Sequence, residues 1–315
     1  MKILFITYVN RSGSTFLANL LSSSEDICVC PESDILVSLF LEDPNKEVYY
    51  PADQLLKSFS KDMKMGAWEI GSDIESCLSE AKTNFQFFME VIRNYRDRKK
   101  PSASLIVFKA ERLSFLMSRL GNFDTPKDEA AIRFLSLIRD PRAVISSQLN
   151  TIHPEYNHPM TRNVVWTSVH WNRSLSRINL FNSEKSPLLI IKFEDLISKN
   201  NKCVTEIARF LGLNLEGLNP EKGELLMTMP INVKSIHKLA NQNPESERID
   251  GWRSVLSPKN TYLIERTCRI GMEMFEYTRK NSGIRLLEEL NRIIYIFTYN
   301  IQVLYRKLKL KLANF

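Results

Sequence analysis

Residues 3–17 read ILFITYVNRSGSTFL, an apolar run followed by a short polar loop and a helix-forming segment. The run at 3–9 is short and rich in Ile, Leu and Phe, which predicts a buried strand. A helix is predicted at 14–23, directly after Gly13, a residue that tolerates a positive φ or the close approach of a ligand. The sequence therefore predicts a strand, a tight turn and the start of a helix.

The loop between this strand and helix offers groups that bind anions. A cation and three hydroxyls flank helix-start amides that have no partner within the helix: Arg11, Ser12, Ser14 and Thr15. The pattern predicts an anion site. It lacks the Gly-Lys-Ser/Thr end of a Walker A loop and the three glycines of a dinucleotide loop. An ordinary turn with a serine cap is the alternative.

Similar apolar runs recur along the chain at helical intervals. Strands are predicted at 105–108, 134–138 and 188–193, and helices at 76–98, 141–150, 161–182, 202–211 and 258–274. Strands that alternate with helices are typical of a parallel sheet covered by helices. We therefore predict one α/β domain over residues 1–280, with a central parallel sheet flanked by helices.

A second polar motif follows the strand predicted at 134–138. It reads Arg139-Asp140-Pro141-Arg142-Ala143, with Ser147 about two helical turns further on. Arg139 follows the carboxyl end of a strand, where open α/β sheets bind ligands. A surface charge cluster is the alternative. Two such anion sites in one chain predict a ligand with two separated phosphates.

The composition is that of a globular protein. Of the 315 residues, 43% are hydrophobic and 25% are charged. The chain has 43 Lys and Arg residues and 36 Asp and Glu residues, which gives a net charge of +7. Such a balance suits an anionic ligand, a nucleic acid or a membrane surface, but the basic residues are dispersed, so we expect no nucleic-acid partner. The 5 cysteines have no metal-site spacing, which predicts buried thiols and no bound metal.

Four motifs together resemble the sulfotransferases that use 3'-phosphoadenosine 5'-phosphosulfate (PAPS). Residues 11–15 resemble their 5'-phosphosulfate loop, and Arg139 with Ser147 resembles their 3'-phosphate motif. Residues 193–196 (Phe-Glu-Asp-Leu) and 251–253 (Gly-Trp-Arg) are similar to two further elements of that family. The resemblance covers about residues 1–280 and implies the P-loop-NTPase-like sulfotransferase fold.

The resemblance also implies roles for individual residues. Glu32 lies 21 residues after Arg11, as in the branch that includes the tyrosylprotein sulfotransferases and uses a glutamate base; no histidine lies near residues 108–112 in the sequence. Arg11 and Lys109 would stabilise the leaving phosphate. PAPS would be the co-substrate, with no metal, and its contacts would come from Arg11, Ser12, Gly13, Ser14, Thr15, Phe16, Arg139, Ser147, Ser235, Trp252 and Arg253.

The segment at 281–315 has a different pattern. Seven apolar residues recur at alternating steps of three and four: Leu287, Leu290, Ile294, Phe297, Ile301, Leu304 and Leu308. This spacing predicts an amphipathic C-terminal helix, which ends in Arg306, Lys307, Lys309 and Lys311. Three partners fit it: the body of the protein, a partner helix such as a second copy, or a membrane surface.

The resemblance predicts transfer of a sulfuryl group from PAPS to an acceptor hydroxyl of a glycan or glycolipid. A lipid, a sterol or a peptidyl tyrosine is the alternative acceptor. A nucleotide kinase and a non-catalytic binding protein on the same fold are the alternatives of a different class. No run is long enough to span a bilayer, so we expect a cytoplasmic enzyme, with peripheral membrane contact through the last helix as an option.

Overall fold

A computed structural model of the chain describes residues 2–62, 64–121, 131–153, 156–181, 186–237, 239–242, 245–280 and 286–312, with the side chains of the last helix described as far as Tyr305. The chain forms two compact units, each described below by itself. The first unit comprises residues 1–138 and 177–246, and the second comprises residues 139–176 and 247–315. The proposed boundary between residues 280 and 281 remains a prediction.

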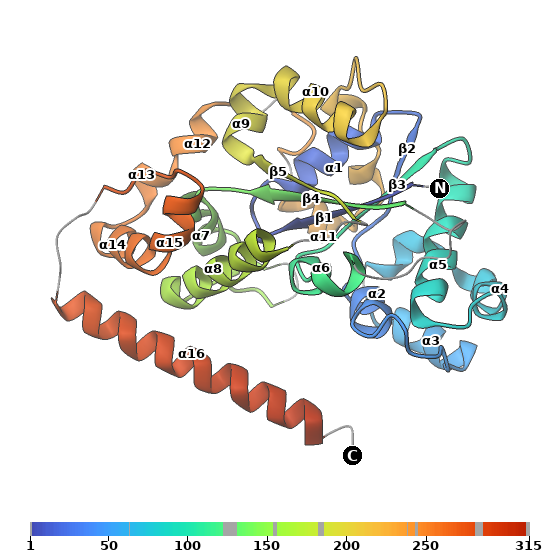
Figure 1. Ribbon diagram of the computed structural model, residues 1–315, viewed down its shortest axis with the longest axis horizontal. Helices are drawn as coiled ribbons and strands as arrows, with labels where there is room; N and C mark the ends of the chain where they lie inside the picture. Colours follow the sequence, from blue (N-terminus) through green and yellow to red (C-terminus); the bar gives the residue numbers. More distant parts are fainter. Residues whose placement is uncertain are drawn as a thin grey trace. The chain divides into compact units, whose positions relative to one another are not determined.

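The first unit contains a parallel sheet in the order β2-β3-β1-β4-β5 (Figure 1). Its strands are β1 (Lys2–Tyr8), β2 (Ile27–Val29), β3 (Leu105–Lys109), β4 (Ala131–Ile138) and β5 (Leu188–Lys192). The predicted fold class is confirmed. β2 was not predicted, because a strand of three residues is too short to produce a periodic pattern.

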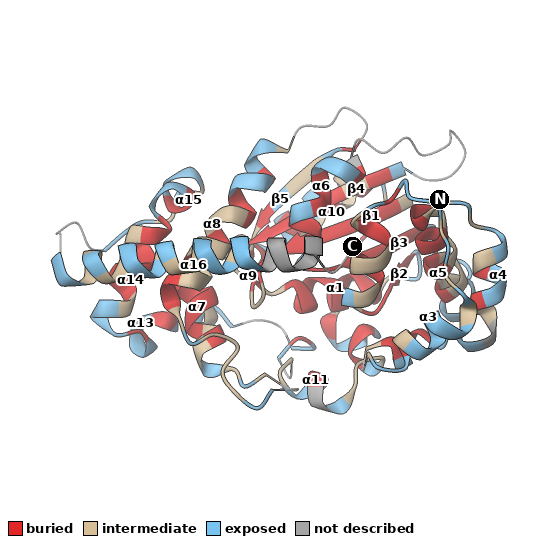
Figure 2. Ribbon diagram, turned by 90° about the horizontal axis from the view of Figure 1, so that it is seen from below, coloured by how far each residue is buried: buried red, intermediate tan, exposed pale blue. Residues whose placement is uncertain are grey.

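Both faces of β1, β3 and most of β4 are buried, which is why these strands read as continuous apolar runs, whereas the edge strand β5 is largely half-buried. On one face Leu4, Ile6 and Leu135 belong to a core shared with residues of helices α1 (Ser14–Ser22), α9 (Phe193–Ser198) and α10 (Asn200–Leu211). On the other face the ring of Phe5 packs against Phe88 and Phe134. Figure 2 shows the strands as a buried layer.

The remaining elements of the first unit lie around this sheet. They are α2 (Asp34–Leu36), η1 (Val37–Leu41), α3 (Ala52–Phe59), η2 (Met65–Trp68), η3 (Gly71–Asp73), α4 (Ile74–Ser79), α5 (Asn84–Lys99), α6 (Leu113–Gly121), η4 (Pro220–Lys222), η5 (Leu225–Met227) and α11 (Ile231–Ser235). The single helix predicted at 76–98 is wrong. Two helices form instead, because Thr83 and Gln86 make a capping box that starts α5 anew.

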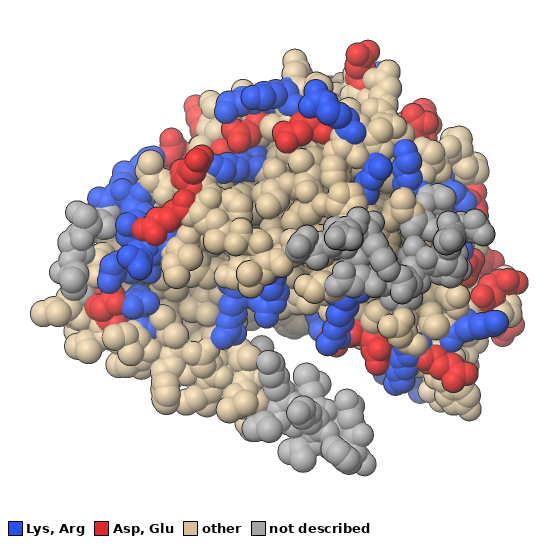
Figure 3. All heavy atoms as spheres, viewed as in Figure 1, with Lys and Arg blue, Asp and Glu red and all other residues tan. Residues whose placement is uncertain are grey.

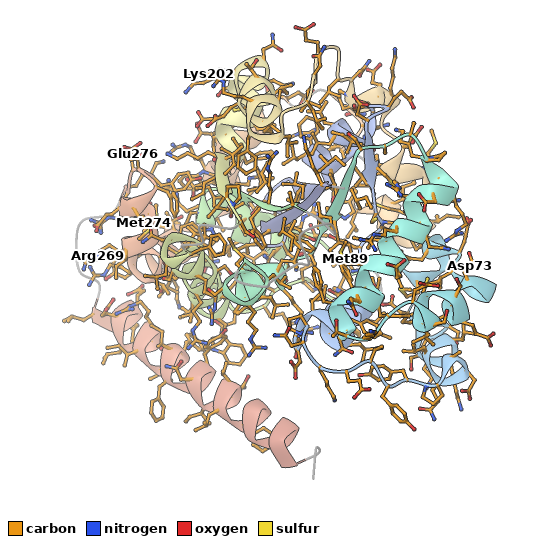
Figure 4. The ribbon with its side chains drawn as sticks, turned by 45° about the vertical axis from the view of Figure 1, so that its right-hand side comes forward. Asp73, Met89, Lys202, Arg269, Met274 and Glu276 are labelled. Carbon is orange, nitrogen blue, oxygen red and sulfur yellow. The ribbon has the colours of Figure 1, made fainter. Side chains whose placement is uncertain are left out.

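Two side chains of α5 contact Asp73, the residue just before α4. Asn94 on α5 donates to a carboxylate oxygen of Asp73 at 3.2 Å, and Nε of Arg98 lies 3.5 Å from the same oxygen. Figure 4 labels Asp73 just before α4 and Met89 within α5, whose side chain is buried. Lys202 projects outward from α10 in the same view, and Figure 3 shows basic and acidic side chains side by side along that helix.

The second unit is helical. It contains α7 (Pro141–Asn150), α12 (Glu247–Asp250), α13 (Trp252–Val255), α14 (Pro258–Thr267), α15 (Arg269–Met274) and α16 (Leu286–Leu312), and α8 (Val164–Leu180) runs from this unit into the first. The bounds of α7 are those predicted, because Asp140 caps the helix and Pro141 occupies its first turn.

Two further findings concern the whole chain. The five cysteines are all buried free thiols, as predicted. Among the residues that the structure describes, no helix combines the length and the apolar character needed to cross a bilayer.

Candidate active site

The loop after β1 has an unusual backbone conformation. Arg11 has φ 75° and Gly13 has φ 89°, and the amide of Ser12 donates to the carbonyl of Val9 at 3.1 Å. A positive φ is costly for arginine and easy for glycine, so strain is concentrated at this turn. The positive φ predicted for Gly13 is confirmed.

The start of α1 has no side-chain cap among the described residues. Gly13 is its N-cap residue, and its first turn contains no acidic residue. The first amides of the helix therefore lack internal partners and carry the positive end of the helix dipole. Ser14 and Thr15, the first two residues of this turn, add hydroxyl groups. These features form a cradle for a phosphate or sulfate group.

Close packing requires a glycine in this cradle. A Cβ atom on Gly13 would lie 2.3 Å from Cδ2 of Phe193, the first residue of α9. The Phe-Glu-Asp-Leu motif thus packs against the anion loop, 180 positions away in the sequence. Phe16, by contrast, is buried in the core with Leu17, so only its backbone can serve a ligand.

The side chain of Arg11 reaches a distant segment of the same unit. Its Nη1 donates to the carbonyl of Ile236 at 3.2 Å, and burial lowers the pKa of the guanidinium. Ile236 follows Ser235, the last residue of α11, whose side chain is exposed. The predicted residue Ser235 is therefore one position from a contact with the anion loop.

Polar side chains meet where β1, β2 and β3 end. The hydroxyl of Tyr8 and the ammonium of Lys109 both donate to the same carboxylate oxygen of Glu32. The ammonium of Lys64 lies 3.6 Å from the other oxygen. Because parallel strands end at one edge of a sheet, residues 101 positions apart converge there, as they do in other α/β ligand sites.

The charges in this cluster determine its protonation. Burial by itself would raise the pKa of Glu32, but the positive charges of Lys109 and Lys64 outweigh it and hold that pKa well below its usual range. Burial lowers the pKa of Lys109, whose side chain is only 1% exposed, although Glu32 opposes the shift. Burial and the neighbouring carboxylate raise the pKa of Tyr8. Glu32 is therefore an ionised carboxylate and Tyr8 a neutral hydrogen-bond donor.

His237 is a member of this environment that the sequence did not indicate. Burial, together with the charges of Lys109 and Arg11, lowers the pKa of its imidazole to about 3, although Glu32 opposes the shift. The sequence did not indicate a histidine near Lys109, because His237 lies 128 positions after it in the chain. The ring is neutral at pH 7, with one nitrogen that donates a hydrogen bond and one that accepts.

His237 gives a prediction for stability against pH. Below about pH 6.5 the unfolded chain protonates this residue, while the folded chain keeps it neutral down to a pKa of about 3. The unfolded state then binds more protons, so the free energy of unfolding should fall as the pH decreases through this window. Between pH 7 and pH 5.5 we expect the free energy of unfolding of His237→Gln to fall by about 1 kcal/mol less than that of the unaltered protein. Urea unfolding at the two pH values measures this, and equal losses would contradict the assignment.

The second unit holds the other predicted group of site residues. Nη2 of Arg139 donates to the carbonyl of Arg248 at 2.8 Å, and the indole of Trp171 donates to the carbonyl of Arg139 at 3.1 Å. These bonds orient the segment before α7. Ser147 lies within α7 and is half-buried.

Arg142 in the same motif has a structural role. Its guanidinium is buried between Asp140, at 2.6 Å, and Glu265, at 2.7 Å. Asp140 also accepts from the amide of Arg142 at 2.8 Å, so the carboxylate occupies the start of α7. A phosphate at this motif would therefore bind through Arg139 and Ser147 rather than through Arg142.

Trp252 and Arg253 form part of the same unit. The guanidinium carbons of Arg142 and Arg253 lie 4.1 Å and 4.6 Å from the ring centroid of Trp252, which is buried. Nε of Arg253 donates to Asp250 at 2.6 Å, and the side chain of Arg253 is 40% exposed. Cation–π contacts thus hold the indole in place.

The predicted site residues fall into two groups, one in each unit. The first unit contains Arg11, Ser12, Gly13, Ser14, Thr15, Phe16, Glu32, Lys109 and Ser235, and the second contains Arg139, Ser147, Trp252 and Arg253. Tyr8, Lys64 and His237 were missed; of these, only Tyr8 had a sequence signal, as a polar residue at the end of a strand. Within the described ranges, no three His, Cys, Asp or Glu side chains gather as a metal ion would require.

The family model and the solved structures that match this chain describe the same kind of protein. A family model described as "Sulfotransferase family" matches residues 4–217. No curated protein sequence matches the chain. The fold is similar to that of a solved sulfotransferase domain from the curacin biosynthetic pathway, with 17% identity and a TM-score of 0.60 over 89% of this chain and 99% of that one. It is also similar to the sulfotransferase domain of the Synechococcus PCC 7002 olefin synthase, with 20% identity and a TM-score of 0.58 over 88% and 95% of the two chains.

Proposed function

This chain belongs to the sulfotransferase family, and from that premise we propose that it transfers a sulfuryl group from PAPS to a hydroxyl of a glycan or glycolipid. The main supporting observation is the ion pair of Glu32 and Lys109 at the strand ends, in the same unit as the uncapped start of α1. A base, a cation and an anion cradle are the three parts that such a transfer needs.

Two groups of predicted residues suit the two ends of the donor. Arg11, Lys109 and the first amides of α1 suit the 5' end of the donor, where the sulfuryl group is attached. Arg139 and Ser147 suit the 3'-phosphate, because a guanidinium offers two parallel donors to phosphate oxygens. The indole of Trp252 is buried against the guanidinium groups of Arg142 and Arg253, so it would support this motif from within rather than present a free ring face to the purine base.

In the reaction, the bond between sulfur and the bridging oxygen of the leaving phosphate breaks while the acceptor oxygen bonds to sulfur. Negative charge develops on the bridging oxygen, where Lys109 and Arg11 would stabilise it. The proton of the acceptor hydroxyl would pass to an oxygen of Glu32. Tyr8, as a neutral donor to Glu32, would keep that carboxylate in position.

The low pKa of Glu32 is compatible with this role. A hydroxyl becomes far more acidic once its oxygen begins to bond to sulfur, so a weak base suffices for a late proton transfer. Lys109 would also turn from Glu32 toward the leaving oxygen as charge develops there. Loss of that partner raises the pKa of Glu32 at the moment when it must accept the proton.

Two features support a glycan-type acceptor. The net charge of +7 favours anionic molecules, including acidic sugars and glycolipids. In the second unit, the ring of Tyr156 stacks between His153 and His158, with centroid distances of 4.5 Å and 5.8 Å, and Tyr156 is 63% exposed. Exposed stacked rings are surfaces on which the C–H face of a sugar can pack.

Thermal unfolding with adenosine 3',5'-bisphosphate tests the donor site. At about 100 times its dissociation constant, a ligand that binds only the folded state stabilises it by about 2.7 kcal/mol. We expect this shift with the bisphosphate and a smaller one with ADP or 5'-AMP. Arg139→Ala should abolish it, because the 3'-phosphate loses its fork of donors.

A matched control for this variant is Arg269→Ala, which removes the same charge from an exposed position of the same unit (Figure 4). It should keep the full shift. Equal shifts with ADP would favour a nucleotide kinase, and the absence of any shift would contradict the donor assignment. Transfer of labelled sulfate from PAPS to sets of glycans, glycolipids, sterols and tyrosine peptides then identifies the acceptor, and transfer to tyrosine peptides alone would contradict a glycan.

A further inference from the structure

The apolar stripe of α16 faces away from the unit to which the helix belongs. Six of its described members are 50–68% exposed: Leu287, Leu290, Ile294, Phe297, Ile301 and Leu304. We call these residues, together with Leu308, the α16 seam. Figure 2 shows the exposure along this helix. So large an apolar face is unusual on a soluble monomer and indicates a binding surface.

A different face of α16 packs on the second unit. The indole of Trp166 donates to the carbonyl of Tyr295 at 3.0 Å. Arg173 donates to Asn300 at 2.8 Å, and its guanidinium carbon lies 4.9 Å from the ring centroid of Tyr299. These contacts hold the helix without covering the seam. The second unit, which is part of the body considered from the sequence as a partner, therefore does not bury the stripe.

The spacing of the seam is that of helix–helix packing. Steps of three and four residues average 3.5, the period at which one helix packs along another. From Leu287 to Leu308 the seam reads Leu, Leu, Ile, Phe, Ile, Leu, Leu, the same in both directions. Two antiparallel copies would therefore place leucines against leucines at both ends and the Ile and Phe residues together in the middle.

The charges of the helix favour the same arrangement. Its start contains Glu288 and Glu289, and its end contains Arg306, Lys307, Lys309 and Lys311. Glu289 is already paired with Arg292 and Arg266 of the same chain, so the basic end decides the direction. A parallel pair would place the two basic ends together, whereas an antiparallel pair separates them and opposes the two helix dipoles.

A membrane surface fits this helix less well. A helix that lies on lipid carries Lys and Arg along its polar face. In α16 the basic residues are clustered in the last turns, and apart from that cluster the helix has only Arg292, which is bonded to Glu289. The geometry points to a two-fold homodimer in which the α16 seams of two antiparallel copies bury one another.

Sedimentation equilibrium of the full chain tests the dimer. We expect twice the chain mass of 36.6 kDa. The double variant Phe297→Asp/Ile301→Asp should sediment as the monomer with an unchanged circular dichroism spectrum, because both side chains are already exposed in one copy. The control Asn291→Asp/Gln302→Asp adds the same charges outside the seam and should remain a dimer.

Cross-linking tests the direction of the helices. The native cysteines are buried, so Leu290→Cys and Leu304→Cys introduce accessible thiols. In an antiparallel pair, a mixture of the two variants should cross-link and each variant alone should not. Cross-linking of Leu290→Cys to itself would overturn the antiparallel arrangement. A monomer at sedimentation equilibrium would overturn the dimer. If that monomer also co-sediments with vesicles of phosphatidylglycerol and phosphatidylcholine, the seam binds a membrane surface instead.

Discussion

Replacement of Glu32 by Gln is expected to lower kcat by about 10²–10⁴-fold, the usual contribution of a general base. An amide has nearly the shape of the carboxylate but cannot accept the proton of the acceptor hydroxyl. The affinity for adenosine 3',5'-bisphosphate should be retained, because the anion loop and the Arg139 segment are unchanged. Steady-state kinetics with a generic acceptor and calorimetric titration with the bisphosphate measure the two effects.

The same replacement also removes a partner from the buried ammonium of Lys109. Breaking a buried ion pair costs about 3–5 kcal/mol where the remaining charge stays uncompensated, so urea unfolding must accompany the kinetics. Glu32→Asp keeps the charge and should retain part of the turnover. Glu42→Gln, which removes an exposed carboxylate from the same unit, should leave kcat unchanged. Turnover of Glu32→Gln at the rate of the unaltered protein would exclude Glu32 as the base.

Replacement of Gly13 by Ala should abolish bisphosphate binding and destabilise the fold. The added methyl would lie 2.3 Å from the ring of Phe193, and an L-residue at φ 89° is itself strained. Overpacking costs about 1–3 kcal/mol, and a left-handed conformation adds about 1–2 kcal/mol. Either response, a displaced ring or a changed backbone, alters the cradle at the start of α1. Thermal unfolding with and without the bisphosphate measures both losses.

Gly66→Ala is the matched control for this prediction. No atom lies within 4 Å of the position that its Cβ would take, so stability should change by no more than about 0.5 kcal/mol. The double variant Gly13→Ala/Phe193→Ala removes the clash but leaves the backbone strain. If Gly13→Ala kept the bisphosphate affinity of the unaltered protein, the loop would not be the anion site.

The sequence was most informative where the determining interactions are local. Apolar runs identified four of the strands, and the cap and the proline at Asp140-Pro141 placed both ends of α7 correctly. The loop from Arg11 to Thr15 could be recognised for the same reason, since a strand, a glycine and a helix start are adjacent in the chain. β2 was missed, as were the break between α4 and α5 and the break between α14 and α15 within the helix predicted at 258–274, because each depends on only a few residues.

The chemistry of the site was decided by the tertiary structure. A parallel sheet brings its strand ends to one edge, and only there do Tyr8, Glu32 and Lys109 meet. Their protonation depends on burial and on charges from distant segments, which is why neither Lys64 nor His237 could be identified from the sequence. The apolar seam of α16 was visible in the sequence, but which of its faces packs on the protein was not. A periodic pattern reports that a face will be buried; only the fold determines what buries it.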